Sequence, residues 1–151
     1  MIYRQRPDAD VRMASARKLV KMLLDADDLY PAHRKEFVRL ALWKVTEAEG
    51  GKYNTRYRSK ASCQPGGNLQ HDHVWERAKM ADELIANPKQ MHEILDKAIG
   101  CVVTKDEHKL LTEVSVSEPD LQGWERYCAA CIVVLDGVTG KEIETCLESW
   151  P

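Results

Sequence analysis

The sequence has no long hydrophobic run. The longest apolar stretch, from Tyr127 to Leu135, is far shorter than the roughly 18 residues that a membrane-spanning helix requires. Residues 1–10 are polar and lack the apolar centre of a secretory signal. These absences disfavour membrane and secreted proteins, so we expect a cytoplasmic protein with no membrane partner.

The sequence also lacks a strong excess of either charge. Its 151 residues carry a formal net charge of -2, with 44% hydrophobic and 30% charged residues. These values are ordinary for globular proteins and disfavour disordered, collagen-like and coiled-coil chains. The length suits one domain with a substantial core, so we expect a single domain over residues 1–151.

The small total hides an uneven charge distribution. Residues 1–60 carry fourteen Lys and Arg and eight Asp and Glu, a net charge of +6. Residues 61–151 carry eight basic and sixteen acidic residues, a net charge of -8. A basic region can meet a polyanion while an acidic region holds cations or maintains solubility.

A regular cysteine framework is missing as well. The chain has an odd number of cysteines, five, and no secretory signal, so we expect reduced thiols. Cys128 and Cys131 have the Cys-x-x-Cys spacing of redox or zinc pairs. However, they lie in the apolar stretch Tyr127–Leu135, which we interpret as a buried strand, and packed thiols are the favoured interpretation.

Helical patterns dominate the first third of the chain. Apolar residues recur at helical spacing over residues 10–24, and a second pattern runs from Pro31 to the Gly50-Gly51 pair. We therefore predict a helical N-terminal part over residues 1–51. Residues 74–85 and 91–99 predict two further helices, and a turn at 136–140 predicts a β-hairpin-like end to the C-terminal part, residues 113–151.

A basic segment, Lys52 to Lys60, follows the N-terminal helices. If this segment is extended, the two-residue period of a strand places its cations on one face; they include Lys52, Arg56, Arg58 and Lys60. A row of cations about 7 Å apart can follow a phosphodiester backbone, and guanidinium groups match phosphate oxygens. We predict that these four residues bind nucleic acid. The alternative is a solvated edge strand whose charges prevent aggregation.

Two histidines flank an aspartate at the end of the next expected strand, in His71-Asp72-His73. Later, the short apolar strand 101–103 leads into Thr104-Lys105-Asp106-Glu107, which fits a capping box. His108 is therefore expected within the first turn or so of a helix. Free backbone N–H groups at a helix start favour a nearby phosphate.

This order of residues resembles the core of HNH-type, or ββα-metal, nucleases. The resemblance covers residues 69–112, where His-Asp-His-Val ends one strand and Thr-Lys-Asp-Glu-His opens a helix after another. It implies that Asp72 and His108 bind a divalent metal ion such as Mg²⁺ or Mn²⁺, and that His73 is the general base. A neutral imidazole can take a proton from water, and the metal can stabilise negative charge on the phosphate.

The chain departs from this family between the two halves of the motif. The family has a short glycine-rich loop with a central asparagine, whereas roughly 25 residues of expected helix separate Trp75 from Cys101 here. We therefore expect a divergent member with an α+β fold: N-terminal helices, a ββα-metal-like centre with inserted helices within residues 52–112, and the C-terminal strands. The implied function is metal-dependent phosphodiester hydrolysis, with DNA as the favoured substrate.

Two other interpretations use the same residues without catalysis. In the first, Cys63, Cys101, His108 and either His71 or His73 form a structural zinc site, although these residues lack the usual close ligand spacing. In the second, the chain is an interaction module whose basic face meets nucleic acid or an acidic protein.

Overall fold

The computed structural model describes residues 3–146, and it combines helices with a four-stranded sheet. The α-helices are α1 (Ala9–Asp25), α2 (Pro31–Glu47), α3 (Arg77–Ala86), α4 (Met91–Leu95), α5 (Lys105–Ser117) and α6 (Trp124–Ala129). The strands are β1 (Tyr57–Ser59), β2 (Leu69–His73), β3 (Gly100–Thr104) and β4 (Val134–Asp136), and short 3₁₀ turns occupy Ala61–Cys63 and Pro88–Gln90. This architecture confirms the α+β class. Within the described residues, no helix is both long and apolar enough to cross a membrane.

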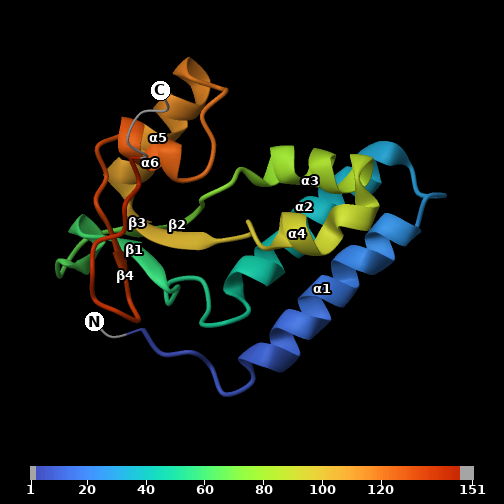
Figure 1. Cartoon of the computed structure of the whole chain (residues 1–151), viewed down its shortest axis with the longest axis horizontal. Coiled ribbons are helices and arrows are strands. Elements are labelled where there is room, and N and C mark those ends of the chain that lie inside the picture. Colours follow the sequence, from blue (N-terminus) through green and yellow to red (C-terminus); the bar gives the residue numbers. More distant parts are fainter. Residues whose placement is uncertain (1–2, 147–151) are drawn as a thin grey trace.

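Helices α1 to α4 form one half of the molecule, on the right in Figure 1. The apolar positions that predicted α1 and α2 share a face on each helix, as helical spacing requires. Those faces are buried, through Ala16, Val20 and Leu24 on α1 and Val38, Leu42 and Val45 on α2. Together with residues of α3 and α4 they make one hydrophobic core. The prediction of two N-terminal helices is confirmed.

The sheet and the helices α5 and α6 form the other half (Figure 1). The strand order is β2-β3-β1-β4, with β1 and β3 parallel and the two outer pairs antiparallel. A second hydrophobic core contains Val103 of β3, Leu111 of α5 and Tyr127 of α6. Trp75 packs against both cores, so the segment that follows β2 joins the two halves.

Two segments differ from the expectations drawn from the sequence. Strand β1 covers only Tyr57–Ser59, so residues 52–60 are not one extended strand. The stretch 127–135 is not one strand either, because Tyr127 belongs to α6 and Cys131 has a left-handed φ of 55° before β4 begins. A short apolar run does not by itself distinguish a strand from a buried helix.

The C-terminal turn forms where the sequence predicts it. The N–H of Gly140 donates to the carbonyl of Asp136 at 2.7 Å. Across this turn Leu135 forms an antiparallel bridge with Glu142. The expected hairpin-like end is therefore present, although its first arm is short.

Candidate functional site

Strands β2 and β3 unite the two halves of the histidine motif. They pair antiparallel from Leu69 opposite Thr104 to His73 opposite Gly100, although α3 and α4 lie between them in the sequence. Helix α5 begins directly after β3. Two strands and a helix are therefore contiguous in space, and the inserted helices belong to the other half of the molecule (Figure 1).

The start of α5 is fixed by the expected capping box. The hydroxyl of Thr104 accepts the Glu107 N–H at 3.2 Å, and the Glu107 carboxylate accepts the Thr104 N–H at 2.8 Å. This geometry orients the first turn and with it His108. Nε2 of His108 lies 3.8 Å from Oδ1 of Asp72, and the His108 side chain is 41% exposed. The two expected metal ligands are neighbours in space.

Asp72 is buried, and its other carboxylate oxygen is already engaged. Oδ2 accepts the Tyr127 hydroxyl at 2.6 Å and lies 3.5 Å from Nη1 of Arg126. The same nitrogen donates to the backbone carbonyls of His73 and Val74. Burial raises the pKa of Asp72, and the Arg126 charge and the Tyr127 hydrogen bond oppose that rise. A buried carboxylate needs such partners, because desolvation of an unpaired charge is costly.

The free donor atoms suit a metal ion that draws most of its ligands from elsewhere. The separation of 3.8 Å between Asp72 Oδ1 and His108 Nε2 is less than two metal–ligand bonds of about 2.1 Å each, so both atoms can reach one ion. Among residues 3–146, no three or more His, Cys, Asp or Glu side chains form a group that could hold a metal. The described residues therefore supply one carboxylate oxygen and one imidazole nitrogen, and an ion held there would need water or substrate oxygens as its other ligands.

The ligands of the alternative zinc site do not assemble. Cys101 is fully buried in β3, whereas Cys63 is exposed in a 3₁₀ turn. The described residues contain no closed group of metal-ligating side chains that includes either of them. The four-ligand arrangement expected for a structural zinc ion is therefore not formed.

His71 and His73 lie on the face of β2 opposite to Asp72, because neighbouring side chains of a strand alternate. There both rings contact Trp43 of α2, with centroid separations of 5.3 Å and 4.7 Å. Nε2 of His71 and Nε2 of His73 lie 3.3 Å and 3.2 Å from the hydroxyl oxygen of Thr46. Gly100 makes room for this cluster, since a Cβ there would lie 2.5 Å from Cε1 of His71.

The contacts of His71 determine where the protons lie. Its Nδ1 is 2.7 Å from the carbonyl oxygen of Lys52, so Nδ1 carries a proton. Burial lowers the pKa of His71, which makes the neutral ring the expected form, with Nε2 as an acceptor for the Thr46 hydroxyl. The Thr46 oxygen can then accept the Nε2 proton of His73. The carbonyl of Trp43, 2.9 Å from the same hydroxyl, is the competing acceptor.

In this arrangement Nδ1 of His73 carries no proton and has a free lone pair. The described residues provide no hydrogen-bond partner for it, and none of their buried side-chain N or O atoms lacks one, so Nδ1 is reachable by solvent. Burial lowers the pKa of His73 from 6.5 to about 2, and the nearby positive groups, including Arg77, act in the same direction. His73 is therefore a neutral imidazole with one accessible acceptor.

The basic segment is partly neutralised by the end of the chain. Arg56 makes two hydrogen bonds to the carboxylate of Asp136, at 3.0 Å and 2.7 Å, and Lys60 pairs with Glu142 at 2.9 Å. Arg58 is buried beside Ser62. Lys52 lies in a turn with its Nζ over the rings of Trp43 and Tyr53. The expected single face of cations is not formed, because the segment is not extended throughout and its side chains have different surroundings.

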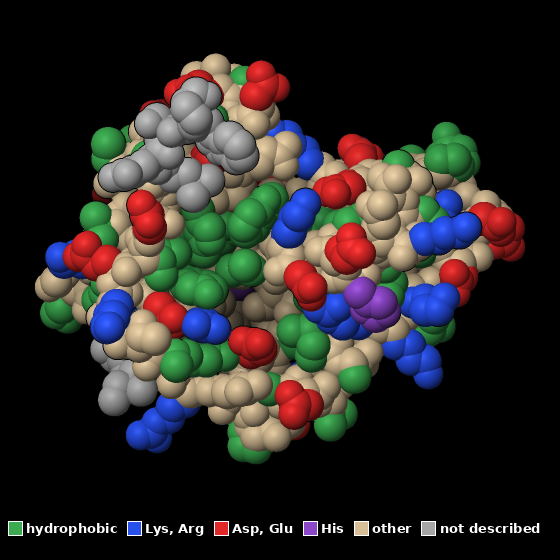
Figure 2. Space-filling view, viewed as in Figure 1, with side chains coloured by type: hydrophobic (Ala, Val, Ile, Leu, Met, Phe, Trp, Pro, Cys, Tyr) green, Lys and Arg blue, Asp and Glu red, His purple; other side chains and the backbone are tan. Residues whose placement is uncertain are grey.

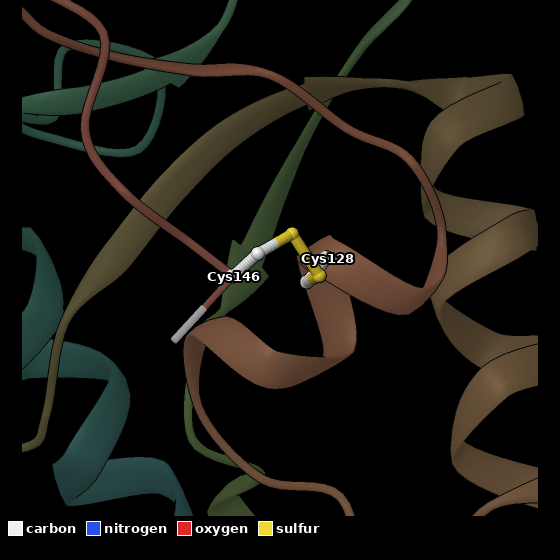
Figure 3. The surroundings of a disulfide bond; sticks show 2 residues. All are labelled: Cys128 and Cys146. Atoms are coloured by element: carbon white, nitrogen blue, oxygen red, sulfur yellow. A yellow bond between two sulfur atoms is a disulfide. The ribbon is translucent and has the colours of Figure 1, made fainter. Parts of the chain in front are cut away.

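The expectation that all cysteines are reduced is wrong. Cys128 of α6 and Cys146 form a disulfide, which attaches the C-terminal segment to this helix (Figure 3). Cys131 is an exposed free thiol rather than a packed one. The pairing joins residues 18 apart and follows from the fold of the C-terminal part, because spacing alone does not determine disulfide connectivity.

A cavity of about 270 Å³ opens between the two halves of the molecule. Figure 2 shows this hollow, with acidic and basic side chains interspersed around it. Arg17 and Arg56 line it, but both are paired with carboxylates, and Thr46 connects its wall to the histidine cluster. The cavity therefore adjoins the candidate site; Glu49, which also lines it, accepts the Tyr3 hydroxyl and forms no ion pair within residues 3–146.

The residues of other helices that contact the histidine motif were not predicted from the sequence. Arg126 and Tyr127 come from α6, more than fifty positions after Asp72, and Thr46 and Trp43 come from α2. Their positions carry no local signal, because only the tertiary fold makes them neighbours of β2. Comparisons of the chain with protein-family models, with curated proteins and with solved structures found no match.

Proposed function

We propose that this protein is a metal-dependent nuclease that hydrolyses phosphodiester bonds, with DNA as the favoured substrate. The observation that carries the proposal is the approach of His108 to Asp72 across the β2–β3–α5 unit, at 3.8 Å. Asp72 and His108, which come from two separate segments and match the HNH-type motif, meet there, while the side chain of His73 lies on the opposite face of β2.

In this proposal, Asp72 and His108 hold the metal ion. Oδ1 of Asp72 and Nε2 of His108 are the donors, while Tyr127 and Arg126 keep the other carboxylate oxygen in place. The ion would supply stabilisation of the negative charge that develops on the phosphate and the leaving oxygen. The partial exposure of His108 leaves an approach for substrate.

His73 is the proposed general base, acting through Nδ1. Thr46 fixes the ring through Nε2, so that the accessible nitrogen can accept a proton from water. A pKa of about 2 makes this imidazole a weak base in the free protein. The negative charge of a bound phosphodiester favours the imidazolium form and raises that pKa toward the working range.

A second candidate function is a non-catalytic nucleic-acid-binding module. The specific observation in its favour is the Arg126 side chain, which is 4% exposed and already compensates the charge of Asp72. A carboxylate neutralised by a fixed guanidinium attracts a cation less strongly than a free one. In this alternative the histidine cluster is structural.

Cleavage of nucleic acid by the purified protein distinguishes these functions. Supercoiled plasmid, single-stranded DNA and RNA are incubated with Mg²⁺, Mn²⁺ or Ni²⁺. We expect metal-dependent cleavage of DNA that His73→Ala reduces by at least about a hundredfold, the usual lower range for loss of a general base. His33→Ala is the matched control, because His33 is exposed on α2 and contacts Tyr30 instead of the site.

The two functions give opposite results in this assay. Absence of cleavage in every metal, or equal cleavage by a folded His73→Ala protein, contradicts the nuclease proposal. Binding of DNA without cleavage supports the non-catalytic module.

A further inference from the structure

Two cations lie over the Trp43 ring, and one of them contacts the backbone of a third, Arg39. Cζ of Arg77 lies 4.7 Å from the centroid of the Trp43 ring, and Nζ of Lys52 lies 5.7 Å from it. Arg77 reaches the backbone carbonyl of Arg39 with Nη1 at 3.4 Å, so the two arginines are neighbours. Within residues 3–146, none of the three cations forms an ion pair. We call Arg39, Lys52 and Arg77 the tryptophan-side cations.

An aromatic ring holds a cation in a different way from a carboxylate. The ring face attracts the positive charge and positions it, but the charge is not cancelled. On α2, Glu47 accepts the indole N–H of Trp43, and its carboxylate lies 3.9 Å from Nζ of Lys44. It is therefore committed to other partners, and the tryptophan-side cations keep their charge.

The pair of arginines is unfavourable in the free protein. Burial lowers the pKa of Arg77, and the adjacent positive charge of Arg39 lowers it further. Arg77 is also the first residue of α3, at the positive end of the helix dipole, where a cation is disfavoured. A bound anion would relieve this repulsion.

We infer that Arg39, Lys52 and Arg77 bind the phosphate groups of a nucleic acid and are the main backbone contacts of the proposed nuclease. This inference rests on the proposed function. The link between the two is Trp43, whose ring also contacts His73, the proposed base, at a centroid distance of 4.7 Å. A phosphodiester on these cations lies next to the proposed base. Arg56 and Lys60 contribute less, since each is paired with a carboxylate.

The contacts of Trp43 also indicate what part of the nucleic acid is recognised. Arg77, Lys52 and the two histidine rings already surround the indole, so it is not available as a stacking platform for bases. Guanidinium and ammonium groups bind phosphate oxygens without reading base identity. Binding is therefore expected to depend on salt and only weakly on sequence.

Equilibrium binding of DNA tests the inference without a readout of cleavage. Fluorescence anisotropy of a labelled 20-base-pair duplex is measured in EDTA over a range of KCl concentrations. The test variant is Arg39→Gln/Arg77→Gln, and the matched control, Arg56→Gln/Lys60→Gln, removes the same charge. We expect the test variant to bind roughly tenfold or more weakly and its salt slope to fall by about 1.8, the value for two lost duplex phosphate contacts. The control should change affinity by less than about threefold.

Arg39→Glu alone provides a second variant, because Arg39 is exposed and its substitution does not disturb the Trp43 packing. It should weaken binding more than Lys60→Glu. Equal losses in the two double variants, no loss in either, or no binding by the wild-type protein would overturn the inference. Because cleavage is not measured, loss of binding in the test variant upholds these contacts even if the protein proves not to be a nuclease.

Discussion

The polar side chains on the two faces of strand β2 have opposite electrostatic surroundings. On one face, Asp72 is a buried anion held by Tyr127 and Arg126, with His108 at its free oxygen. On the other, His71 and His73 are neutral rings, and the cations nearby are held by an aromatic ring. Alternation along a single strand separates these environments.

The two faces therefore differ in the ligands that they can bind. On one face Arg126 compensates the charge of Asp72, so the atoms left to bind a metal ion are Oδ1 of Asp72 and the partly exposed imidazole of His108. The histidine face contains an accessible lone pair and uncompensated cations, so it suits a phosphate anion. The proposed metal site and the proposed phosphate contacts therefore lie on opposite faces of β2, and the nuclease proposal requires one phosphate to reach both of them around this edge strand.

Removal of Arg126 should give the largest loss of stability, because it removes the positive charge that compensates Asp72. Arg126→Met leaves Asp72 as a buried charge with no cation at its Oδ2, and we expect a loss of about 3 kcal/mol in the free energy of unfolding, measured by urea denaturation. The exposed Arg12→Met control, which breaks a surface pair with Asp8, should cost less than about 1 kcal/mol. The double variant Arg126→Met/Asp72→Asn should lose less stability than the sum of the single variants. Additive losses would show that the pair is not coupled.

A smaller loss is expected when the hydrogen-bonded centre of the histidine face is removed. Thr46→Val keeps the shape of the side chain but leaves Nε2 of both histidines without the hydroxyl, at a cost of about 1–3 kcal/mol. Thr112→Val is the matched control, since that threonine is exposed and bonds only within α5. Equal unfolding midpoints for the two variants would exclude a structural role for the Thr46 hydroxyl.

The smallest effect is expected at the ion pair between Arg56 and Asp136, which involves neither Asp72 nor the two histidines. It tests whether an arginine–carboxylate pair elsewhere in the protein also contributes to stability. The hydrogen bonds from Arg56 hold the pKa of Asp136 at about 2, below its ordinary value of 3.8. The folded state therefore releases this proton more readily, and the pair stabilises the protein above about pH 4 and loses that contribution as the pH falls toward 2. In Arg56→Gln, the free energy of unfolding should depend less on pH in this range. An unchanged acid profile relative to wild type, with Lys60→Gln as control, would contradict the assignment.

Local patterns predicted much of the candidate site, and tertiary contacts supplied the rest. The capping box at Thr104 and the strand that contains Asp72 are encoded within a few residues, so the position of His108 could be predicted. Helix α6 was missed because its apolar residues continue into β4, and only the left-handed backbone at Cys131 separates them. Arg126 could not be assigned to Asp72 from the sequence, because no periodicity relates residues 54 positions apart. The single cationic face expected of the basic segment is not formed, and its partners Asp136 and Glu142 lie about 80 residues away, beyond any local pattern.

Paramagnetic relaxation by Mn²⁺ tests the proposed metal site most directly, because it needs no substrate. The imidazole resonances of all five histidines are recorded while Mn²⁺ is added in substoichiometric steps. Our account predicts that the His108 signals broaden first, that His33 and His92 are little affected, and that Asp72→Asn abolishes the selectivity. Uniform broadening of all histidines, or the same His108 broadening in Asp72→Asn, would contradict a metal site between β2 and α5.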